Sequence, residues 1–372
     1  MRSSIPENIR AARLSVLAVF SLNGFALASW FVRIPAVQRE LSLSEGFLGL
    51  ALLGTAVGAM VAMPLTGALS SRFGSRRVVG VTALLLAFSV IPLAFAPSFA
   101  LLVPAMVLLG AANGSLDVSM NAQAVAVEEL YGRPIMTSFH AAFSFGGLAG
   151  AVTGGVVASL NIGPLPHLSV VGLLCAVAAL AAFRSLLPSS ADAADEGAPA
   201  FARPTRALLG LGVISFCVLL GEGAMADWSA VYLNDTLKTG PGFAAAGYAA
   251  FSLAMAFGRL FGDRITARLG PSTLVRFCGA LAAVGLGVSL AIGQPLLALI
   301  GFACAGAGFS VVFPAALSAA GRTEGMTVGA ALAAVATAGY TGFLLGPPAI
   351  GFAAELFGLG AALYIVVALS GA

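Results

Sequence analysis

Long apolar segments follow one another along almost the whole chain, and few charged residues interrupt them. Only 9% of the 372 residues are Asp, Glu, Lys or Arg, against about 25% in a soluble globular domain. The mean hydropathy is +1.02. A chain with so few charges cannot cover a surface that faces water, so the sequence predicts an all-α membrane protein.

A helix that crosses a bilayer needs about 20 mostly apolar residues. Division of the chain at charges, prolines and loop residues gives twelve candidate spans, at residues 13–33, 46–70, 77–96, 99–123, 136–160, 166–187, 207–232, 243–262, 272–292, 294–319, 327–350 and 354–371. One long polar segment separates six spans from six. The sequence therefore predicts three parts: an N-terminal six-helix half (1–187), a cytoplasmic linker (188–206) and a C-terminal six-helix half (207–372).

The distribution of Lys and Arg predicts the orientation of these spans. With a cytoplasmic N-terminus, 15 of the 18 Lys and Arg residues, Arg259 and Arg276 among them, fall on the cytoplasmic side. Arg33, Arg39 and Lys238 fall on the other side, which is the asymmetry that the positive-inside rule describes. We therefore expect a multi-pass protein of the bacterial cytoplasmic (inner) membrane, with its N-terminus in the cytoplasm.

The residue types that carry catalysis or hold cofactors form no pattern typical of an enzyme. Four cysteines lie inside apolar stretches, where packing is their ordinary role: Cys175, Cys217, Cys278 and Cys304. We find no Cys–His spacing of a metal site, no nucleophile–base pair and no nucleotide-binding loop. We therefore expect no metal, no cofactor, no nucleic-acid partner and no enzymatic activity.

Residues 67–77 (GALSSRFGSRR) stand between the second and third spans. They resemble the cytoplasmic signature of the major facilitator superfamily, G-x-L-a-D-r-x-G-r-[KR]-x. The usual Asp is Ser71 here, so the carboxylate that normally pairs across the cytoplasmic gate is absent. A degenerate copy at residues 258–264 (GRLFGDR) keeps a carboxylate, Asp263.

Five further motifs narrow the resemblance: WFVRIP (30–35), NGSLDVSMN (113–121), SFH (138–140), EGAMADWS (222–229) and GPP (346–348). Together they resemble the bacterial branch related to fucose permease that includes the rhizopine-transport (MosC-type) proteins. This resemblance covers nearly the whole chain. It implies the major facilitator fold, in which two six-helix halves form a parallel repeat and transport by alternating access. It does not imply a substrate, because one fold hosts many functions.

Asp117 is the first candidate for proton coupling. It lies about 18 residues into the fourth span, where a charged carboxylate costs about 2.5–3.5 kcal/mol on insertion scales. That cost falls if the carboxyl is protonated or faces a watery cavity, and coupling requires a carboxyl that exchanges protons. The resemblance to fucose permease adds Asn121, four residues on and on the same helix face. The alternative is that Asp117 only hydrogen-bonds a neighbouring helix.

The seventh span carries two more carboxylates, Glu222 in its outer half and Asp227 near its outer end. We expect Glu222 to share the proton-coupling role, Asp227 to contact substrate and Trp228 to stack on a sugar-like ring. The alternatives are an interhelical hydrogen bond for Glu222, a solvated helix end for Asp227 and a membrane-interface position for Trp228. Trp30 stands at the matching place of the first span, and we assign it to the substrate site as well.

Three polar residues complete the expected substrate site. Asn23 and Asn121 offer neutral hydrogen bonds to a polyol, and His140 enters the fifth span near the cytoplasm. Packing or helix capping is the alternative role of His140. The fifth span also carries glycines at a spacing that lets helices approach closely: Gly146, Gly150, Gly154 and Gly155.

Charged residues at the two ends of the spans predict gates. Glu128 lies seven residues after Asn121 on the same helix face, where it can meet a cytoplasmic arginine such as Arg76. Because surface ion pairs are weak singly, we expect several residues to close the inner side together: Arg72, Arg76, Arg77, Glu128 and Asp263. Arg33 ends the first span on the outer side. We expect it to pair with Asp227 as an outer gate, and the alternative is that it snorkels to the membrane interface.

The leading interpretation is a secondary active transporter that carries a small polar solute, sugar- or polyol-like, by proton-coupled symport. One charge that moves down 100 mV supplies about 2.3 kcal/mol, which is an adequate driving force. Proton-coupled export of a metabolite or drug is the alternative within transport, and a non-transporting membrane receptor is the alternative outside it. The expected partners are the substrate, protons and the lipid bilayer, and the expected state is a monomer.

The outer-gate hypothesis predicts the effect of a charge exchange. Arg33→Asp and Asp227→Arg are each expected to lower uptake in proteoliposomes, because each leaves one charge facing a like charge. The double variant restores the pair and is expected to recover uptake. A double variant that transports no better than the single variants would show that the pair is wrong.

Overall fold

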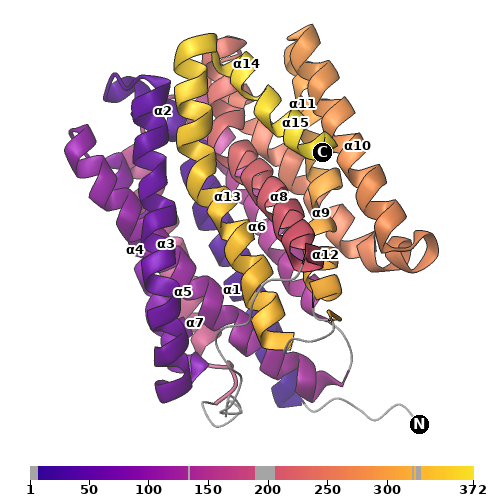
Figure 1. Ribbon diagram of the computed structural model, residues 1–372. Helices are drawn as coiled ribbons and strands as arrows, with labels where there is room; N and C mark the ends of the chain where they lie inside the picture. Colours follow the sequence, from indigo (N-terminus) through magenta and orange to yellow (C-terminus); the bar gives the residue numbers. More distant parts are fainter. Residues whose placement is uncertain (1–6, 133–134, 189–205, 321, 324–327) are drawn as a thin grey trace. The chain divides into compact units, whose positions relative to one another are not determined.

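The computed structural model describes residues 7–132, 135–188, 206–320, 322–323 and 328–372 (Figure 1). The regular elements in these ranges are helices, so the prediction of an all-α protein is confirmed. The predicted linker, residues 188–206, lies almost wholly outside the described residues. Contacts group the chain into two compact units, Met1–Leu41 with Gly54–Ala194 and Ser42–Leu53 with Asp195–Ala372. These units differ from the predicted halves in residues 42–53, the start of one long helix.

The first unit holds the helices that precede residue 188. They are α1 (Glu7–Phe31), α2 (Ile34–Glu40), most of α3 (Glu45–Phe73), α4 (Ser75–Ser89), the turn η1 (Pro92–Ala94), α5 (Phe99–Tyr131), α6 (Met136–Ser159) and α7 (Pro164–Phe183). Within this unit α1 packs against α5, α6 and α7, and α4 packs against α5 and α7.

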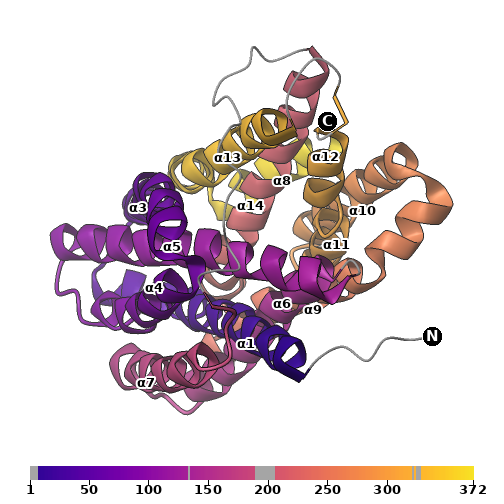
Figure 2. The same ribbon diagram turned by 90° about the horizontal axis from the view of Figure 1, so that it is seen from below.

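The second unit holds the helices that follow residue 205, together with the first turns of α3. They are α8 (Arg206–Val231), the π-helical turn η3 (Tyr232–Thr236), α9 (Pro241–Leu269), α10 (Pro271–Ile292), α11 (Pro295–Phe309), α12 (Val312–Ala320), α13 (Val328–Phe357), α14 (Leu359–Ala362) and α15 (Tyr364–Gly371). Here α8 packs along α13, and α11 lies between α9 and α10; α8 and α13 are side by side in both ribbon views (Figures 1 and 2).

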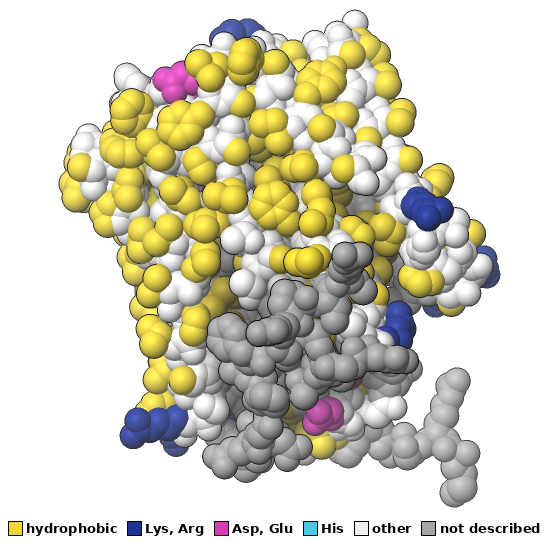
Figure 3. Space-filling model, viewed as in Figure 1, with side chains coloured by type: hydrophobic (Ala, Val, Ile, Leu, Met, Phe, Trp, Pro, Cys, Tyr) yellow, Lys and Arg dark blue, Asp and Glu magenta, His cyan; other side chains and the backbone are white. Residues whose placement is uncertain are grey.

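Ten helical segments of the described chain are long and apolar enough to cross a membrane. They correspond to the first ten predicted spans, while α13 stands at the eleventh and α14 with α15 at the twelfth. The face shown in Figure 3 is mostly hydrophobic, with few charged side chains. Large apolar side chains are exposed in both units, such as Leu173 at 61% and Val284 at 64%. Apolar surface of this extent is what a lipid environment requires.

Several helices are longer than the predicted spans, whose ends were placed where the apolar residues stop. The helix continues past that point: α5 ends at Tyr131 rather than 123, α9 at Leu269 rather than 262, and α13 at Phe357 rather than 350. Each of these helices ends at a glycine with positive φ, which an L side chain rarely adopts: Gly132, Gly270 and Gly358. Backbone hydrogen bonding, rather than hydropathy, therefore sets the helix ends.

Helices α1 and α6 approach so closely that their backbones touch. A Cβ atom on Gly24 of α1 would overlap the Phe143 carbonyl oxygen, and one on Gly146 of α6 would overlap the Ser21 carbonyl oxygen. Gly150, one turn after Gly146, faces the Phe25 carbonyl oxygen in the same way. The close approach predicted from the glycine spacing of the fifth span is confirmed.

A single buried glutamine ties three segments of the first unit together. Gln123 of α5 is fully buried, and its Nε2 donates to Ser75 Oγ at 2.6 Å and to the Leu187 carbonyl oxygen at 3.2 Å. Its Oε1 accepts the Leu187 N–H at 3.0 Å. Ser75 begins α4 and Leu187 follows α7, so the Gln123 side chain joins α5 to the start of α4 and to the segment after α7.

Replacement of this glutamine by an isosteric apolar residue is expected to destabilise the protein. Gln123→Leu leaves the N–H and C=O of Leu187 buried without partners, at about 1–3 kcal/mol each. We expect a clear fall of the thermal unfolding midpoint of the purified protein in detergent. Gln294→Leu is the matched control, because Gln294 is exposed before α11 and its side chain makes no capping bond. Equal midpoints for the two variants would contradict this role of Gln123.

Candidate functional site

Asp117 lies near the middle of α5, as the sequence predicted. The Nδ2 of Asn121 donates to Asp117 Oδ1 at 3.1 Å and to the Asp117 carbonyl oxygen at 2.8 Å. Both side chains are partly buried. The Asp117 side chain therefore has a hydrogen-bond partner within its own helix, one turn away.

The other predicted substrate residues of the first unit lie in its interior. Asn23 is 1% exposed and its Nδ2 lies 3.8 Å from the sulfur of Met120, next to Asn121 on α5. Its Oδ1 has no hydrogen-bond partner among the described residues. His140 of α6 packs edge-on against Phe20, with ring centroids 5.3 Å apart. An amide with a spare acceptor can receive a hydroxyl, whereas the ring contact of His140 agrees with its packing alternative.

The two tryptophans are more deeply buried than a stacking surface would be. Trp30 is 1% exposed and Trp228 is 0% exposed. Both rings are buried within their own units, and the roles expected for Trp30 and Trp228 stay predictions. Its Nε1–H has no acceptor among the described residues, so one polar donor of the second unit is left for a water or a solute.

Arg33 is buried rather than exposed at the outer end of its span. It is 3% exposed, and its Nε donates to Nδ1 of His167 at 2.9 Å. His167 lies in the first turn of α7 and is 5% exposed. Arg33 therefore does not snorkel to an interface, and its pairing with Asp227 stays a prediction. His167 was not among the site residues predicted from the sequence, although the predicted topology already places the starts of the second, fourth and sixth spans on the outer side with Arg33.

The inner-gate residues of the first unit have other partners in this structure. Glu128 Oε2 accepts the backbone N–H groups of Ile135 and Met136, each at 2.6 Å, and so caps the start of α6. Arg76 donates to the Arg184 carbonyl oxygen at 3.1 Å and lies over the Phe183 ring. A contact between Glu128 and Arg76 therefore stays a prediction, and it would need both residues to leave these partners.

The remaining gate residues lie at helix ends. Arg72 and Arg77 are exposed on either side of Gly74, the one residue between α3 and α4, with a φ of 80°. The signature of residues 67–77 is thus a tight helix–helix junction rather than the longer loop that the predicted spans left. Asp263 lies within α9, but its side chain is outside the described residues.

A carboxylate–arginine pair lies inside the second unit. Glu222 Oε2 of α8 is 3.6 Å from the Nη2 of Arg259 on α9, and the two side chains are 17% and 15% exposed. A direct charged hydrogen bond spans about 2.7–2.9 Å, so this pair is loose. The sequence analysis counted Arg259 with the cytoplasmic arginines, but α9 continues to Leu269 and holds Arg259 against α8.

Asp227 is the second carboxylate on α8, four residues before Val231, and helical backbone continues past it through the π-helical turn η3. The apolar helical segment continues nine residues beyond it to Thr236, which is about 13 Å of helix. Tyr248 of α9 is 6% exposed, hydrogen-bonds Ser252 and lies within electrostatic reach of both carboxylates and of Arg259. The second unit thus gathers two carboxylates, one guanidinium and a phenol between α8 and α9.

Metal binding finds no support in the described part of the chain, where no group of three or more His, Cys, Asp or Glu side chains comes together. The described cysteines are free thiols. What the two units contain is partly buried carboxyls, neutral amides and buried arginines on long apolar helices. These features define the class as a polytopic helical membrane protein with polar side chains in its interior.

Comparison with protein families identifies this class. A family model of the Major Facilitator Superfamily matches residues 14–323. The chain belongs to the major facilitator superfamily, and it is therefore a membrane transporter and not an enzyme. The family predicted from the sequence motifs is confirmed.

Three curated relatives cover almost the whole chain. An uncharacterized MFS-type transporter of Yersinia pestis is 38% identical over 366 residues, which are 96% of this chain and 94% of that protein. An uncharacterized transporter of Sinorhizobium fredii is 37% identical over 364 residues, covering 95% and 96%. The membrane protein MosC of Rhizobium meliloti is 35% identical over 364 residues, covering 96% of this chain and 88% of MosC.

Solved structures have the same fold at low sequence identity. A mutant of the nucleoside transporter NupG superposes with a TM-score of 0.77 at 16% identity, covering 96% of this chain and 97% of NupG. A D-xylose-proton symporter gives a TM-score of 0.73 at 15% identity, covering 97% and 96%. These likenesses establish the fold.

The capping contact of Glu128 predicts a stability effect that its neighbour lacks. Glu128→Ala removes the acceptor of two N–H groups at the start of α6, and loss of such a cap costs about 1–2 kcal/mol. Glu129→Ala is the control, because Glu129 is exposed beside it. We expect a lower unfolding midpoint for Glu128→Ala, a smaller fall for Glu128→Gln and none for Glu129→Ala. Identical unfolding midpoints for the two alanine variants would contradict the capping role of Glu128.

Proposed function

We propose that this transporter is a proton-coupled symporter of a small polar solute, with Asp117 and Glu222 as the carboxyls that carry the proton. The observation that carries the proposal is the loose, mostly buried pair of Glu222 and Arg259 at 3.6 Å. An ionised Glu222 is held by the guanidinium. A protonated Glu222 has no charge for Arg259 to hold, so each proton that arrives or leaves makes or breaks an interhelical attraction.

Asp117 supports the same proposal in the first unit. Its carboxylate accepts a hydrogen bond from Asn121, which favours the ionised form, whereas its mid-span position disfavours a permanent charge. These two opposing effects are what a site that gains and loses a proton needs. We assign the release of the proton to the inward-facing state and its uptake to the outward-facing state.

The solute is proposed from the neutral polar groups that accompany these carboxyls. Asn23 has a carbonyl oxygen without a partner and Trp228 has an N–H without an acceptor, among the described residues. Together with Asn121 these groups match hydroxyl-rich, uncharged solutes such as sugars and polyols. A D-xylose-proton symporter has the same fold, which agrees with this substrate class.

The proposed setting follows the charge distribution of the sequence. The excess of Arg on one side of the spans favours the bacterial cytoplasmic membrane with a cytoplasmic N-terminus. The polar residues proposed for coupling and binding all come from one chain, so the proposed cycle works in a monomer. The proposed direction is uptake, and efflux of the same solute driven by an inward proton gradient would instead favour the exporter.

The test begins with a thermal-shift screen of neutral sugars and polyols on the purified protein, followed by uptake of the stabilising solute in proteoliposomes. Wild-type protein is expected to accumulate the solute when an inward proton gradient is imposed. Asp117→Asn and Glu222→Gln are expected to lose most of this accumulation and to retain solute exchange without a gradient, because exchange needs no net proton movement. Glu129→Gln, an exposed carboxyl on the same helix as Asp117, is expected to behave as wild type.

The outcomes separate the parts of the proposal. An Asp117→Asn protein that still responds fully to the gradient would remove Asp117 from the coupling path, and the same result for Glu222→Gln would remove Glu222. A wild-type protein that equilibrates the solute without response to the gradient would overturn symport itself.

A further inference from the structure

Helix α5 carries polar side chains on two opposite faces. Successive residues of an α-helix turn by about 100°, so the side chains of Asn113 and Ser115 point about 160° apart. Three polar residues stand one turn apart on each face: Ser115, Ser119 and Gln123 on what we call the packing face, and Asn113, Asp117 and Asn121 on what we call the polar stripe.

Other helices of the first unit hold each residue of the packing face. Thr66 Oγ1 of α3 is hydrogen-bonded to Ser115 Oγ at 2.8 Å. Thr82 Oγ1 of α4 lies 3.2 Å from Ser119 Oγ, and both of these side chains are buried. Gln123 is bonded to the start of α4, as described above. The polar groups of this face are therefore satisfied by α3 and α4.

The polar stripe has hydrogen-bonding capacity that its own helix does not use. Asp117 and Asn121 are bonded to each other within α5. Asn113 is half-buried, and its Oδ1 is buried without a hydrogen-bond partner among the described residues. A buried carbonyl oxygen without a donor is costly, so a donor that arrives from outside the protein stabilises Asn113.

Asn23 of α1 brings a second such oxygen to the same side of α5. Its Nδ2 lies 3.8 Å from the sulfur of Met120, and its Oδ1 has no partner among the described residues. Met120 follows Asn113 by seven residues, which are two helical turns and about 10 Å along the axis. Asp117 lies between these two positions, so acceptor oxygens accompany the carboxylate on both sides.

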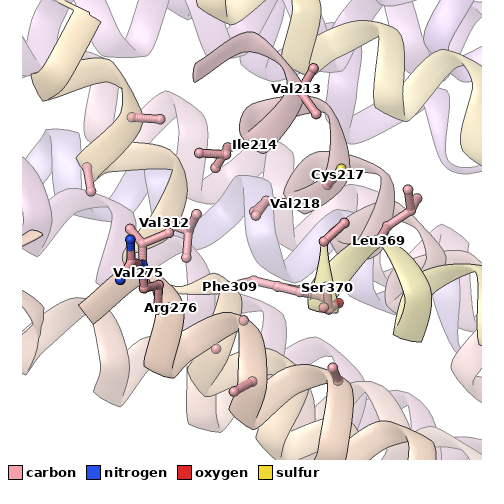
Figure 4. A pocket seen from close by; sticks show the side chains of 18 of the residues that line it. Val213, Ile214, Cys217, Val218, Val275, Arg276, Phe309, Val312, Leu369 and Ser370 are labelled. Atoms are coloured by element: carbon pink, nitrogen blue, oxygen red, sulfur yellow. The ribbon is translucent and has the colours of Figure 1, made fainter. Parts of the chain in front are cut away.

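Acceptor groups of this kind select the chemistry of a solute. Hydroxyl groups supply the donors that carbonyl oxygens need, and they add no charge. The pocket of the second unit in Figure 4 differs, because its lining is mostly apolar, with Val218 and Val312 among the labelled side chains. A hydroxyl-rich solute finds few acceptors there, whereas the polar stripe of α5 offers several.

We propose that Asn113 is a specificity-determining residue of the solute site, and that its Oδ1 accepts a hydroxyl of the solute one turn before Asp117. The solute contacts α5 along the polar stripe from Asn113 to Asn121, which is about 12 Å of helix. Asn113 thereby distinguishes a solute with a hydroxyl at that place from one without it. This inference rests on the proposed function, because it takes the solute to bind beside Asp117.

The test measures how well the purified protein distinguishes a solute from its monodeoxy analogues. The probes are D-glucose, D-xylose and D-sorbitol, and their dissociation constants are measured by calorimetric titration. Wild-type protein is expected to bind one monodeoxy analogue of a bound probe about three- to tenfold more weakly than the probe, the effect of one neutral hydrogen bond. Asn113→Leu is expected to bind the probe and that analogue equally, because the carbonyl that recognises the hydroxyl is gone.

Two further variants separate recognition from folding. Asn113→Ala removes the same amide without adding volume, and it is expected to lose the same discrimination. Ser119→Ala on the packing face breaks the contact with Thr82, so it is expected to lower the thermal unfolding midpoint and to keep the discrimination of the wild type. The solute-free midpoint of Asn113→Leu is expected to equal or exceed that of the wild type, because this variant removes a buried oxygen that has no partner.

The outcomes separate this inference from the proposed function. Unchanged discrimination in both Asn113 variants would overturn the role of Asn113 and leave symport intact. A solute-free midpoint of Asn113→Leu well below that of the wild type would also overturn it, because the amide would then serve a bond within the protein. If wild-type protein binds none of the probes, the hydroxyl-rich solute class is wrong, and the role of Asn113 with it. Uptake that ignores the proton gradient contradicts symport alone, since the binding measurement uses no gradient.

Discussion

A charged or polar group inside an apolar span is stable only if another group of the protein replaces the water it has lost. This constraint decides where the polar side chains of this transporter lie, because leaving one partner of a buried pair alone costs several kcal/mol. The described structure meets it with pairs drawn from different helices or from one helical turn: Asp117 with Asn121, Arg33 with His167, Glu222 with Arg259, and Glu128 with the first N–H groups of α6.

These pairs differ in how firmly they are made. Glu128 holds two backbone N–H groups at 2.6 Å, and Gln123 satisfies both backbone groups of Leu187. Such short contacts fix helix ends, so in this structure they belong to the firmly held part of a unit. The Glu222–Arg259 pair is longer, at 3.6 Å. In the proposed mechanism one proton breaks this pair, while the tight contacts keep the unit intact.

The backbone contacts between α1 and α6 also help to hold the first unit together. Glycines at the crossing bring the two helices together without side chains between them, so the first unit is held by close backbone packing as well as by polar pairs. Lipid provides little hydrophobic force between helices, and close packing replaces it. Exposed apolar side chains then face the bilayer.

The sequence by itself determined the class of the protein, the positions of the first ten apolar helices and the close contact between α1 and α6 through glycines, since these follow from local composition and from spacings of a few residues. It also placed Asp117 next to Asn121, because residues four apart on a helix are neighbours wherever the helix packs. The tertiary structure decided the ends of α5, α9 and α13, the burial of Arg33 and both tryptophans, and the partners His167 and Arg259. These features depend on which helices become neighbours. Arg33 and His167 are 134 positions apart, and no local sequence pattern predicts a contact over that separation.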